Sequence, residues 1–325
     1  MGKKDLYLGI DTGGTGVKYV VTDRDGSVMT SVEVPTDPAS IIESMQRLAS
    51  AVEGALGGEP DFPNLAGLGL ACAGIVNSAT GHLGRSPNLP GWQDRDLAGD
   101  IGTVFRDIPV VLANDVNGAL YGEFRQGAGR GCRNLVMIAL GTGVGGGVII
   151  DGRLVVGSHF GAGEIGHMNL ELDGPPCTCG GRGCLEAWAG SMGLLRRARE
   201  AAGQGAANDD LAQLVARRGE SLNTMDLAGL AARGDAVTVG IFAEAGRRLG
   251  QAIGNIVNLL DPDRVIIGGG VAQAGDLILK PCRETVPGLV LAEKAKNVPV
   301  VAADLGPLAA AVGAACLARE MEISS

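Results

Sequence analysis

Hydrophobic residues recur along the chain with two periods, which predict short buried strands and amphipathic helices. Residues 6–10 and 17–22 have the composition of strands and flank a glycine-rich turn, and residues 27–34 continue with a third strand. Residues 38–56 predict a helix, because apolar side chains recur there at helical spacing after Ser40, a residue suited to cap it. The expected buried face of this helix consists of Ile41, Met45, Leu48, Ala49 and Val52.

The same patterns continue through the rest of the chain. A helix is expected from about Val116, residues 187–255 are mainly helical in pattern, and residues 244–260 should bury one helical face. An alanine-rich helix is expected at about residues 305–325. Further strands are expected at residues 65–71, 109–114, 134–140, 148–155, 264–267 and 298–302.

Two glycine-rich turns share one local plan. The turn Asp-Thr-Gly-Gly-Thr-Gly at 11–16 and the turn Gly-Thr-Gly-Val-Gly-Gly-Gly at 141–147 each join two strands, about 130 residues apart. Backbone N–H groups that point into such turns can hold phosphate. The repeat suggests a duplicated domain that holds one nucleotide from both sides, which predicts an α/β, two-lobed actin/hexokinase-like (ribonuclease H-like) fold with a cleft between the lobes. We expect a small lobe at 1–115, to which the helix at 305–325 returns, and a large lobe at 116–304.

Length and composition favour a cytoplasmic protein of two lobes. The chain has 325 residues, 46% of them hydrophobic, and is too long for one ordinary core. Its formal net charge is −9 and it has no cluster of Lys and Arg, which argues against nucleic-acid binding. The sequence has no apolar run long enough for a membrane span, and its N-terminus lacks the apolar core of a signal peptide. Seven cysteines fit a reducing compartment better than a disulfide framework.

The first glycine-rich turn has the residues of a phosphate and magnesium site. Gly13 and Gly14 allow the backbone to approach a phosphate closely. Thr15 adds a hydroxyl, Lys18 adds a positive charge, and Asp11 can face Mg²⁺. Many glycine-rich turns bind nothing, so this turn alone is a weak signal.

Three further segments each allow a functional and a structural interpretation. Asn88, in the loop Ser-Pro-Asn-Leu-Pro-Gly-Trp, could form a turn or could present its amide to sugar hydroxyls. Asp115, which follows Asn114 at the end of a predicted strand, could be catalytic or could cap the next helix. Glycines 268–270 could let the backbone approach a flat ligand such as adenine, or could form a simple turn.

A histidine and three cysteines have the spacing of a structural zinc site. Four Cys or His ligands complete a tetrahedral zinc site and leave no open position for a reactive water, so the zinc would act as a clamp. Two carboxylates, Glu164 and Glu186, lie three residues before the histidine and two residues after the last cysteine. The clamp would therefore hold polar side chains around a ligand. The four candidate zinc ligands are His167, Cys177, Cys179 and Cys184.

Seven motifs in order make the chain resemble the ROK family (repressors, open reading frames and sugar kinases). They are D-x-G-G-T-x-x-K at 11–18, P-N-L-x-G-W at 87–92, N-D at 114–115, L-G-T-G-x-G-G-G at 140–147, E-x-x-H at 164–167, C-x-C-G-x-x-G-C-x-E at 177–186 and G-G-G-x-x-x-A-G at 268–275. The resemblance spans nearly the whole chain and implies an ATP-dependent hexose kinase, with glucokinases foremost. Since the segment before Asp11 is too short for a helix-turn-helix, we do not expect the repressor branch.

The resemblance implies a role for each matching residue. Asp115 would be the general base that takes the proton of the sugar 6-hydroxyl, and Asp11 would serve Mg²⁺. His167 would bind zinc through one nitrogen and the sugar through the other. The other residues implied to hold the sugar are Asn88, Asn114, Asp115, Glu164 and Glu186. The residues implied to hold ATP are Asp11, Gly13, Gly14, Thr15, Lys18, Gly141, Thr142, Gly143, Gly145, Gly268, Gly269 and Gly270, the last three near adenine.

One loop departs from the family pattern. Members often have G-x-P-G-x-V-D where this chain has ACAGIVN at 71–77, with Ala73 in place of proline and Asn77 in place of aspartate. Because this loop lies near the sugar in the family, the hexose could be fructose, mannose, N-acetylglucosamine or N-acetylmannosamine instead of glucose. A non-catalytic sugar-sensing regulator is a weaker alternative, since a sensor needs neither Asp115 nor two phosphate turns. A homodimer or higher homo-oligomer is expected.

Overall fold

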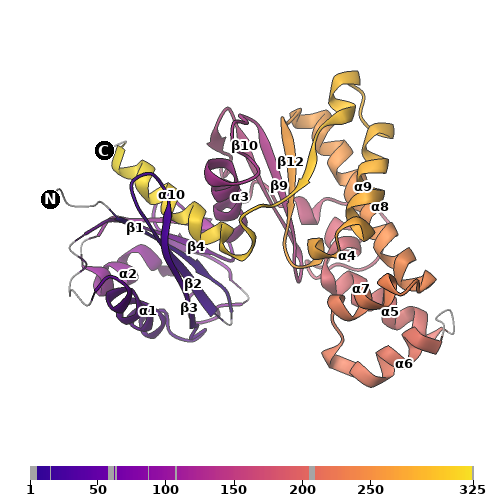
Figure 1. Cartoon of the computed structure of the whole chain (residues 1–325), viewed down its shortest axis with the longest axis horizontal. Coiled ribbons are helices and arrows are strands. Elements are labelled where there is room, and N and C mark those ends of the chain that lie inside the picture. Colours follow the sequence, from indigo (N-terminus) through magenta and orange to yellow (C-terminus); the bar gives the residue numbers. More distant parts are fainter. Residues whose placement is uncertain are drawn as a thin grey trace. The chain divides into compact units, whose positions relative to one another are not determined.

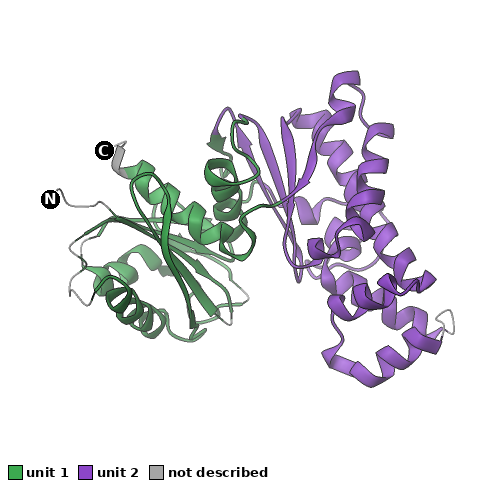
Figure 2. Ribbon diagram, viewed as in Figure 1, with its two compact units in different colours: residues 1–132, 153–162, 303–325 green, residues 133–152, 163–302 purple. Residues whose placement is uncertain are grey.

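The structure is a computed structural model that describes residues 6–14, 16–57, 62, 64–86, 88–106, 108–204 and 209–323 (Figure 1). The chain forms two compact units (Figure 2). The first unit comprises Met1–Cys132, Arg153–Ala162 and Ala303–Ser325, and the second comprises Arg133–Gly152 and Gly163–Ala302. Among the helices within the described ranges, none has the length and apolar character needed to cross a membrane.

The first unit is built on a five-stranded sheet with the order β3-β2-β1-β4-β8. β1 pairs antiparallel with β2 through the first glycine turn, whereas β1, β4 and β8 run parallel. The carboxyl ends of β1, β4 and β8 therefore meet at one edge, where polar side chains that follow the strands can gather. The strands are β1 (Leu6–Thr12), β2 (Gly16–Thr22), β3 (Val28–Pro35), β4 (Leu65–Cys72) and β8 (Val110–Asn114).

Helices cover both faces of this sheet (Figure 1). Alternate strand residues such as Leu8 and Ile10 pack with α1 and α2 into one core, which also contains Trp92. The buried face of α1 is the predicted one, and Ser40 caps the helix by accepting a hydrogen bond from the Glu43 N–H. The helices of this unit are α1 (Ile41–Ala55), α2 (Leu97–Phe105), α3 (Asp115–Gln126) and α10 (Ala309–Ile323), and a small sheet contains β5 (Val76–Asn77), β6 (His82–Leu83) and β7 (Arg95–Asp96).

Helix α10 approaches the opposite face of the sheet closely because two central strands have glycines there. A Cβ atom on Gly9 would lie 2.0 Å from the carbonyl oxygen of Ala311. A Cβ atom on Gly69 would lie 2.0 Å from the carbonyl oxygen of Ala314. Small residues on both sides thus let the helix backbone contact the sheet, which explains part of the high glycine content.

The second unit repeats the strand plan of the first. β9 pairs antiparallel with β10 through the second glycine turn and parallel with β12, which pairs parallel with β13. This order, β10-β9-β12-β13, matches β2-β1-β4-β8 of the first unit and confirms the predicted duplication. The strands are β9 (Leu135–Leu140), β10 (Val144–Ile150), β12 (Arg264–Gly268) and β13 (Val300–Ala302), and the two-residue strand β11 (Arg153–Leu154) follows β10 in the sequence.

The rest of the second unit is mainly helical, as the sequence predicts. Helix α8 is the longest of the helices named here, and its described buried face includes Leu249, Ile253 and Val257. The Cys/His segment contains the short 3₁₀ helix η1 (Ile165–His167). The helices are α4 (Leu185–Ala189), α5 (Ser191–Gly203), α6 (Asp209–Arg218), α7 (Thr224–Ala232), α8 (Ala236–Leu260) and α9 (Asp276–Thr285).

Three local features differ from the sequence-based predictions. The predicted strand at 148–155 is interrupted: Asp151 and Gly152 have φ values of 50° and 78° and turn the chain after Ile150, and Arg153–Leu154 then forms the separate strand β11. Helices α2 and α9 were not predicted. Helix α3 belongs to the first unit, because it packs against α10 and β4. The predicted boundary at residue 115 would place this helix in the large lobe.

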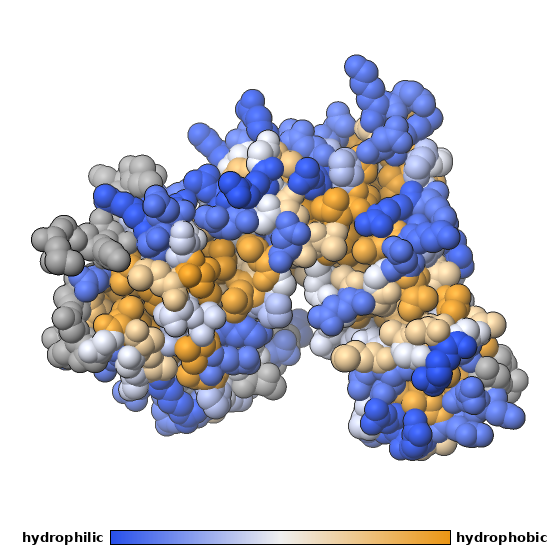
Figure 3. All heavy atoms as spheres, in the orientation of Figure 1, coloured by the Kyte–Doolittle hydropathy of each residue, from blue (hydrophilic) through white to orange (hydrophobic). Residues whose placement is uncertain are grey.

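The surface mixes hydrophilic and hydrophobic residues in both units on the face that Figure 3 shows. The exposed hydrophobic residues are spread over separate elements, among them Met29 in β3, Met225 in α7 and Leu259 in α8. Scattered exposure of this kind is usual for folded proteins, so it identifies no partner surface by itself.

Candidate active site and metal centre

The first glycine turn lies beside the Asn88 loop in the first unit. The Gly13 N–H donates a 3.0 Å hydrogen bond to the Gly16 carbonyl oxygen, which closes the turn. A Cβ atom on Gly14 would lie 3.3 Å from the carbonyl oxygen of Asn88, so the two backbones approach closely. Lys18 lies opposite Asp11 in the register of β1 and β2. Thr15 lies outside the described residues.

The loop that contains Asn88 is anchored by buried apolar residues, which leave the asparagine exposed. Leu89 and Trp92 are fully buried, and the indole N–H of Trp92 donates a 3.0 Å hydrogen bond to the Asp37 carbonyl oxygen. Asn88 itself is exposed. The arrangement makes Asn88 available to a ligand in the first unit.

Asn114 caps helix α3, so the cap that the sequence also allowed for Asp115 is provided by its neighbour. Its Oδ1 accepts hydrogen bonds from the N–H groups of Val116, at 2.9 Å, and Asn117, at 3.2 Å. Its Nδ2 donates a 3.1 Å hydrogen bond to the carbonyl oxygen of Gly74, in the loop that departs from the family pattern. Asp115 is the first residue of the helix, and the Asn114 side chain also makes a hydrogen bond to its carboxylate.

The Asp115 carboxylate is held near the start of α3 by hydrogen bonds from the backbone and from the Asn114 side chain. Its Oδ1 accepts a 3.0 Å hydrogen bond from the Val116 N–H. Burial raises the pKa of Asp115, while hydrogen bonds from the Val116 backbone, its own backbone and the Asn114 side chain oppose the increase. A partly buried carboxyl group with a raised pKa at the end of a parallel strand is suited to accept a proton.

A second carboxylate, Asp11, lies near the carboxyl end of β1 in the same sheet. Burial raises the pKa of Asp11 to about 6, the negative charge of Asp115 adds to the increase, and the charge of Lys18 opposes it. Carboxylate oxygens are the ligands that Mg²⁺ prefers, and a divalent cation would relieve the unfavourable charge. The donor set therefore fits a magnesium ion.

The second glycine turn is held against the start of α5 in the second unit. The Gly141 N–H donates a 2.9 Å hydrogen bond to the Gly143 carbonyl oxygen, and the Ser191 N–H donates one of 2.9 Å to the Gly141 carbonyl oxygen. Thr142 lies within this turn, whereas Gly145 lies in β10, paired with Ala139.

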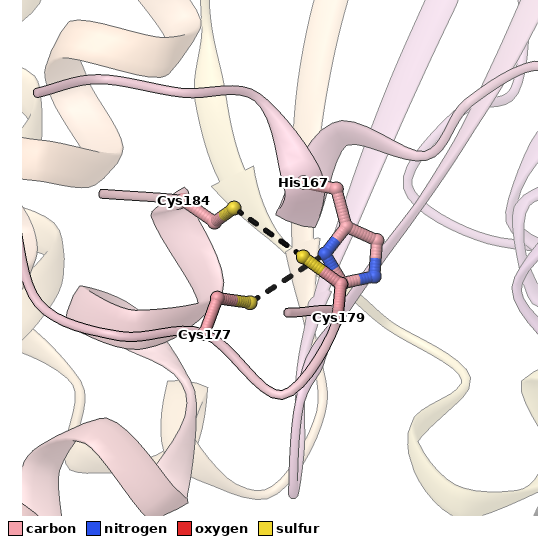
Figure 4. Close-up of side chains that lie close together, drawn as sticks. All are labelled: His167, Cys177, Cys179 and Cys184. Atoms are coloured by element: carbon pink, nitrogen blue, oxygen red, sulfur yellow. Dashed lines mark hydrogen bonds between the residues drawn. The ribbon is translucent and has the colours of Figure 1, made fainter. Parts of the chain in front are cut away.

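The four candidate zinc ligands converge in the second unit (Figure 4). Their ligand atoms all lie within 4.8 Å of one another. The Sγ atoms of Cys179 and Cys184 are 3.8 Å apart, and Nδ1 of His167 is 3.7 Å from Sγ of Cys177. A tetrahedral zinc with Zn–S distances of about 2.3 Å separates two sulfur ligands by about 3.8 Å, so this geometry fits zinc. The second ring nitrogen of His167 points away from the sulfurs (Figure 4).

Tight backbone turns shape the cysteine loop. The Cys177 N–H donates a 2.9 Å hydrogen bond to the Gly181 carbonyl oxygen, and Gly180 adopts a φ of 91°, which favours glycine. Cys184 lies immediately before α4 and is buried. The loop thus returns the third cysteine to the first two, as the sequence predicts.

The two carboxylates that flank the cysteine cluster have different surroundings. Glu164 is exposed and precedes η1. Glu186, in the first turn of α4, is half-buried, and its Oε2 accepts a 3.1 Å hydrogen bond from the Val144 N–H next to the second glycine turn. Its Oε1 accepts a 2.6 Å hydrogen bond from the hydroxyl of Thr178. Glu186 thereby connects the cluster to the turn.

The glycines at 268–270 adjoin a cavity of about 180 Å³ in the second unit. A Cβ atom on Gly269, whose φ is 88°, would lie 2.3 Å from the Leu140 carbonyl oxygen, so only glycine fits there. Gly270 itself lines the cavity. The sequence did not predict the other lining residues, because they belong to separate helices and to the turn after Gly270. The cavity is lined by Thr224, Met225, Ala228, Phe242, Gly270, Val271, Gln273 and Ala274.

The predicted site residues thus form two sets, one in each unit. The first set combines the first turn, Asn88, Asn114 and the two aspartates. The second set combines the second turn, Glu186 and the Cys/His cluster with its neighbour Glu164, while Gly270 lines a separate cavity. Thr178 is a further site residue that the sequence analysis missed, although its position between two cysteines could have indicated it.

Comparisons with known proteins agree with this fold. A glucokinase from Streptomyces coelicolor is 36% identical over 323 residues, which cover 97% of this chain and 98% of that protein. The structure of a ROK family glucokinase from Streptomyces griseus in complex with glucose and AMPPNP has a TM-score of 0.77 and 32% identity, and covers 97% of this chain and 99% of that one. The ROK hexokinase from Thermus thermophilus has a TM-score of 0.80 and 29% identity, and covers 98% of this chain and 100% of that one.

These likenesses, together with the duplicated sheets, define the two-domain actin-like fold of sugar kinases. The model of the ROK family matches residues 7–321. The chain belongs to the ROK family, as the motifs predict.

Proposed function

We propose that the protein is an ATP-dependent hexose kinase that phosphorylates the 6-hydroxyl of glucose. The proposal rests mainly on the different roles of two neighbouring residues, Asn114 and Asp115, at the start of α3. Asn114 caps the helix, which leaves the Asp115 carboxylate available as a base. The glucokinase relative from Streptomyces coelicolor and the glucose and AMPPNP complex of the Streptomyces griseus enzyme support glucose and ATP as substrates.

In the proposed reaction, Asp115 accepts the proton of the 6-hydroxyl while the sugar oxygen forms a bond to the γ-phosphorus. The bond between that phosphorus and the β,γ-bridging oxygen breaks, and ADP leaves. General-base assistance of this kind contributes roughly 10²- to 10⁴-fold. Mg²⁺, held through Asp11, would neutralise the phosphate charge, since phosphoryl transfer depends mainly on positioning and charge stabilisation.

The two glycine turns are proposed to hold the phosphates of ATP, and the cavity beside Gly270 to hold adenine. Backbone N–H groups of the turns supply donors for the phosphate oxygens, and Lys18 supplies a charge. The apolar residues Met225 and Phe242 of the cavity suit a flat aromatic ring. The proposed ATP residues are Asp11, Gly13, Gly14, Thr15, Lys18, Gly141, Thr142, Gly143, Gly145, Gly268, Gly269 and Gly270.

The sugar hydroxyls are proposed to bind a set of polar side chains that can both donate and accept hydrogen bonds. His167 would use the nitrogen that points away from the cysteines, while a structural zinc ion holds its Nδ1. The zinc would be bound by the four-residue cluster and would fix the loop rather than activate water. The proposed sugar residues are Asn88, Asn114, Asp115, Glu164, His167 and Glu186.

Two further proposals concern the cellular location and the oligomeric state of the enzyme. The cluster needs reduced cysteines, and the described cysteines are free of disulfides, which supports a cytoplasmic location. A homodimer or higher homo-oligomer is proposed from the family resemblance, and light scattering of the purified chain would test it.

A coupled assay across a hexose panel tests the proposed function. Glucose, fructose, mannose, N-acetylglucosamine and N-acetylmannosamine would each be offered with ATP, and glucose also with polyphosphate. We expect the highest kcat/KM with glucose and ATP. A much higher kcat/KM with another hexose would contradict glucose but preserve the kinase, and the changed loop at 71–77 makes that the main alternative. Absence of phosphorylation of every sugar would contradict the kinase.

A further inference from the structure

The side chain of Glu186 joins two parts of the second unit that lie far apart in the sequence. Its Oε1 accepts a 2.6 Å hydrogen bond from the Thr178 hydroxyl, and its Oε2 accepts a 3.1 Å hydrogen bond from the Val144 N–H. Thr178 lies in the cysteine loop, whereas Val144 is the first residue of β10 after the second glycine turn. One carboxylate therefore connects the loop and the turn.

The two hydrogen bonds fix the orientation of the carboxylate. A carboxylate at the end of a glutamate side chain rotates readily about its last bond, unless each oxygen has a donor of its own. Both bonds are made to an ionised acceptor, and such bonds are stronger than bonds between neutral groups. The Cys177 Sγ also donates to Oε1, at 3.4 Å, but the Thr178 hydroxyl is the shorter contact and therefore favours the rotation in which Oε2 faces the Val144 N–H.

The glycine turn is shaped to receive this carboxylate. A Cβ atom on Gly143 would lie 2.2 Å from Oε2 of Glu186, so a side chain at this position would displace the carboxylate. Glu186 therefore supports the end of the turn at Gly143 and Val144, whereas backbone hydrogen bonds to Gly141 support its start. A freely rotating carboxylate would no longer hold the Val144 N–H.

We propose that Thr178 is a positioning residue that orders the second glycine turn through Glu186. The proposal rests on the proposed function in one respect, namely that this turn holds phosphates of ATP. Thr178 lies between Cys177 and Cys179, so the cysteine loop sets the position of its hydroxyl. The loop would thereby organise nucleotide binding as well as the sugar side chains.

Two substitutions separate the hydroxyl from the shape of the side chain. Thr178→Val replaces the hydroxyl by a methyl group of similar size and so removes the donor. Thr178→Ser keeps the donor and serves as the matched control. Because Thr178 is exposed and is not one of the four cluster residues, neither change should remove bound zinc or unfold the protein.

Hydrogen–deuterium exchange of the segment 141–147 is the decisive measurement, because it needs no substrate. We expect faster exchange of the Val144 amide in Thr178→Val and wild-type exchange in Thr178→Ser. Calorimetry should show weaker AMPPNP binding to Thr178→Val by roughly tenfold, the effect of about 1.4 kcal/mol. Metal analysis should give the wild-type zinc content in both variants.

Three results would overturn the proposal: unchanged exchange in Thr178→Val, equal loss of protection in Thr178→Ser, or loss of zinc from Thr178→Val. The last would show that Thr178 acts through the metal loop and not through Glu186. Failure of the proposed function is a separate outcome, since it would appear as an inactive wild-type protein. Faster exchange in Thr178→Val alone would still establish the link to the turn.

Discussion

Asp11 and Asp115 both lie at the carboxyl ends of parallel strands of the first sheet, where burial first and the negative charge of Asp115 second raise the pKa of Asp11. The register aligns Asp11 with Ala71, and Ala71 with Ala113, two residues before Asp115. Two neighbouring carboxylates destabilise each other when both are ionised, and a divalent cation removes that repulsion. The arrangement therefore favours Mg²⁺ and destabilises the unliganded protein.

Replacing Asp115 by asparagine tests its role as the base. Asparagine keeps the size of the side chain but accepts no proton at neutral pH, so kcat should fall by roughly 10²-fold or more. Helix α3 should stay folded, because Asn114 and not Asp115 provides the cap. Steady-state kinetics and calorimetry with glucose should therefore show reduced turnover with near wild-type sugar affinity.

The matched control is Asn114→Ala, which removes the cap. It should lower the free energy of unfolding by about 1 kcal/mol. If Asp115→Asn retained kcat within about threefold of wild type, a range well inside that of general-base catalysis, Asp115 would not be the base.

Replacing Asp11 by asparagine should stabilise the unliganded protein at neutral pH. Folding raises the pKa of Asp11 from 3.8 to about 6, so the ionised form is disfavoured in the folded state. The resulting destabilisation is absent below the unfolded pKa, grows as pH rises from about 3.8 to 6, and is complete above pH 6. At pH 7.5, Asp11→Asn should raise the free energy of unfolding by about 1–3 kcal/mol.

Urea unfolding of wild type and Asp11→Asn at pH 4 and pH 7.5 measures this effect. The gain should be much smaller at pH 4, where the wild-type carboxyl group is already protonated in the folded state. An equal gain at both pH values would show that the charge of Asp11 is not its origin.

Replacing Cys179 by serine tests the metal centre. The purified wild-type protein should contain about one zinc ion per chain, and Cys179→Ser should lose most of it, because structural zinc requires all four ligands. Sugar affinity should fall with the zinc, since His167 and Glu186 lose their support. The measurements are elemental analysis and calorimetry.

Cys132→Ser, which changes a cysteine outside the cluster, is the control and should keep its zinc. A zinc-free Cys179→Ser protein that bound glucose normally would refute the proposed clamp.

Glu123 should be important for stability, because it binds the backbone after α3 and the backbone before α10. It is fully buried, and its Oε2 accepts hydrogen bonds from the N–H groups of Ala128, at 2.7 Å, and Asp304, at 3.1 Å. Its Oε1 accepts a 2.8 Å hydrogen bond from the Leu305 N–H. Glu123→Ala removes the acceptor of these hydrogen bonds and should lower the free energy of unfolding by about 3 kcal/mol or more.

Chemical denaturation of Glu123→Ala and of Glu43→Ala checks this prediction. Glu43 is exposed and pairs with Arg47 on the surface, so its loss should change stability by less than about 0.5 kcal/mol. Similar small effects of both substitutions would show that the buried hydrogen bonds contribute little.

Sequence alone determined the features that depend on neighbouring residues. The strands on either side of each glycine turn, the buried face of α1 and the Ser40 cap all follow from local spacing. The cysteine loop was also predictable, because its turns lie within the eight residues from Cys177 to Cys184. The repeated turns further predicted the duplicated fold, since each unit forms the same hairpin beside parallel strands.

Only the tertiary structure decided which of two adjacent residues capped α3 and what Glu186 contacts. Asn114 and Asp115 both suit a helix cap, and in the folded chain Asn114 is the cap while its amide donates to the Gly74 carbonyl oxygen, 40 residues away in the sequence. The hydrogen bond from Val144 to Glu186 spans 42 residues, and that from Leu305 to Glu123 spans 182. Periodicity cannot predict such contacts, because they arise when strands and helices pack and bring distant backbone groups to one carboxylate.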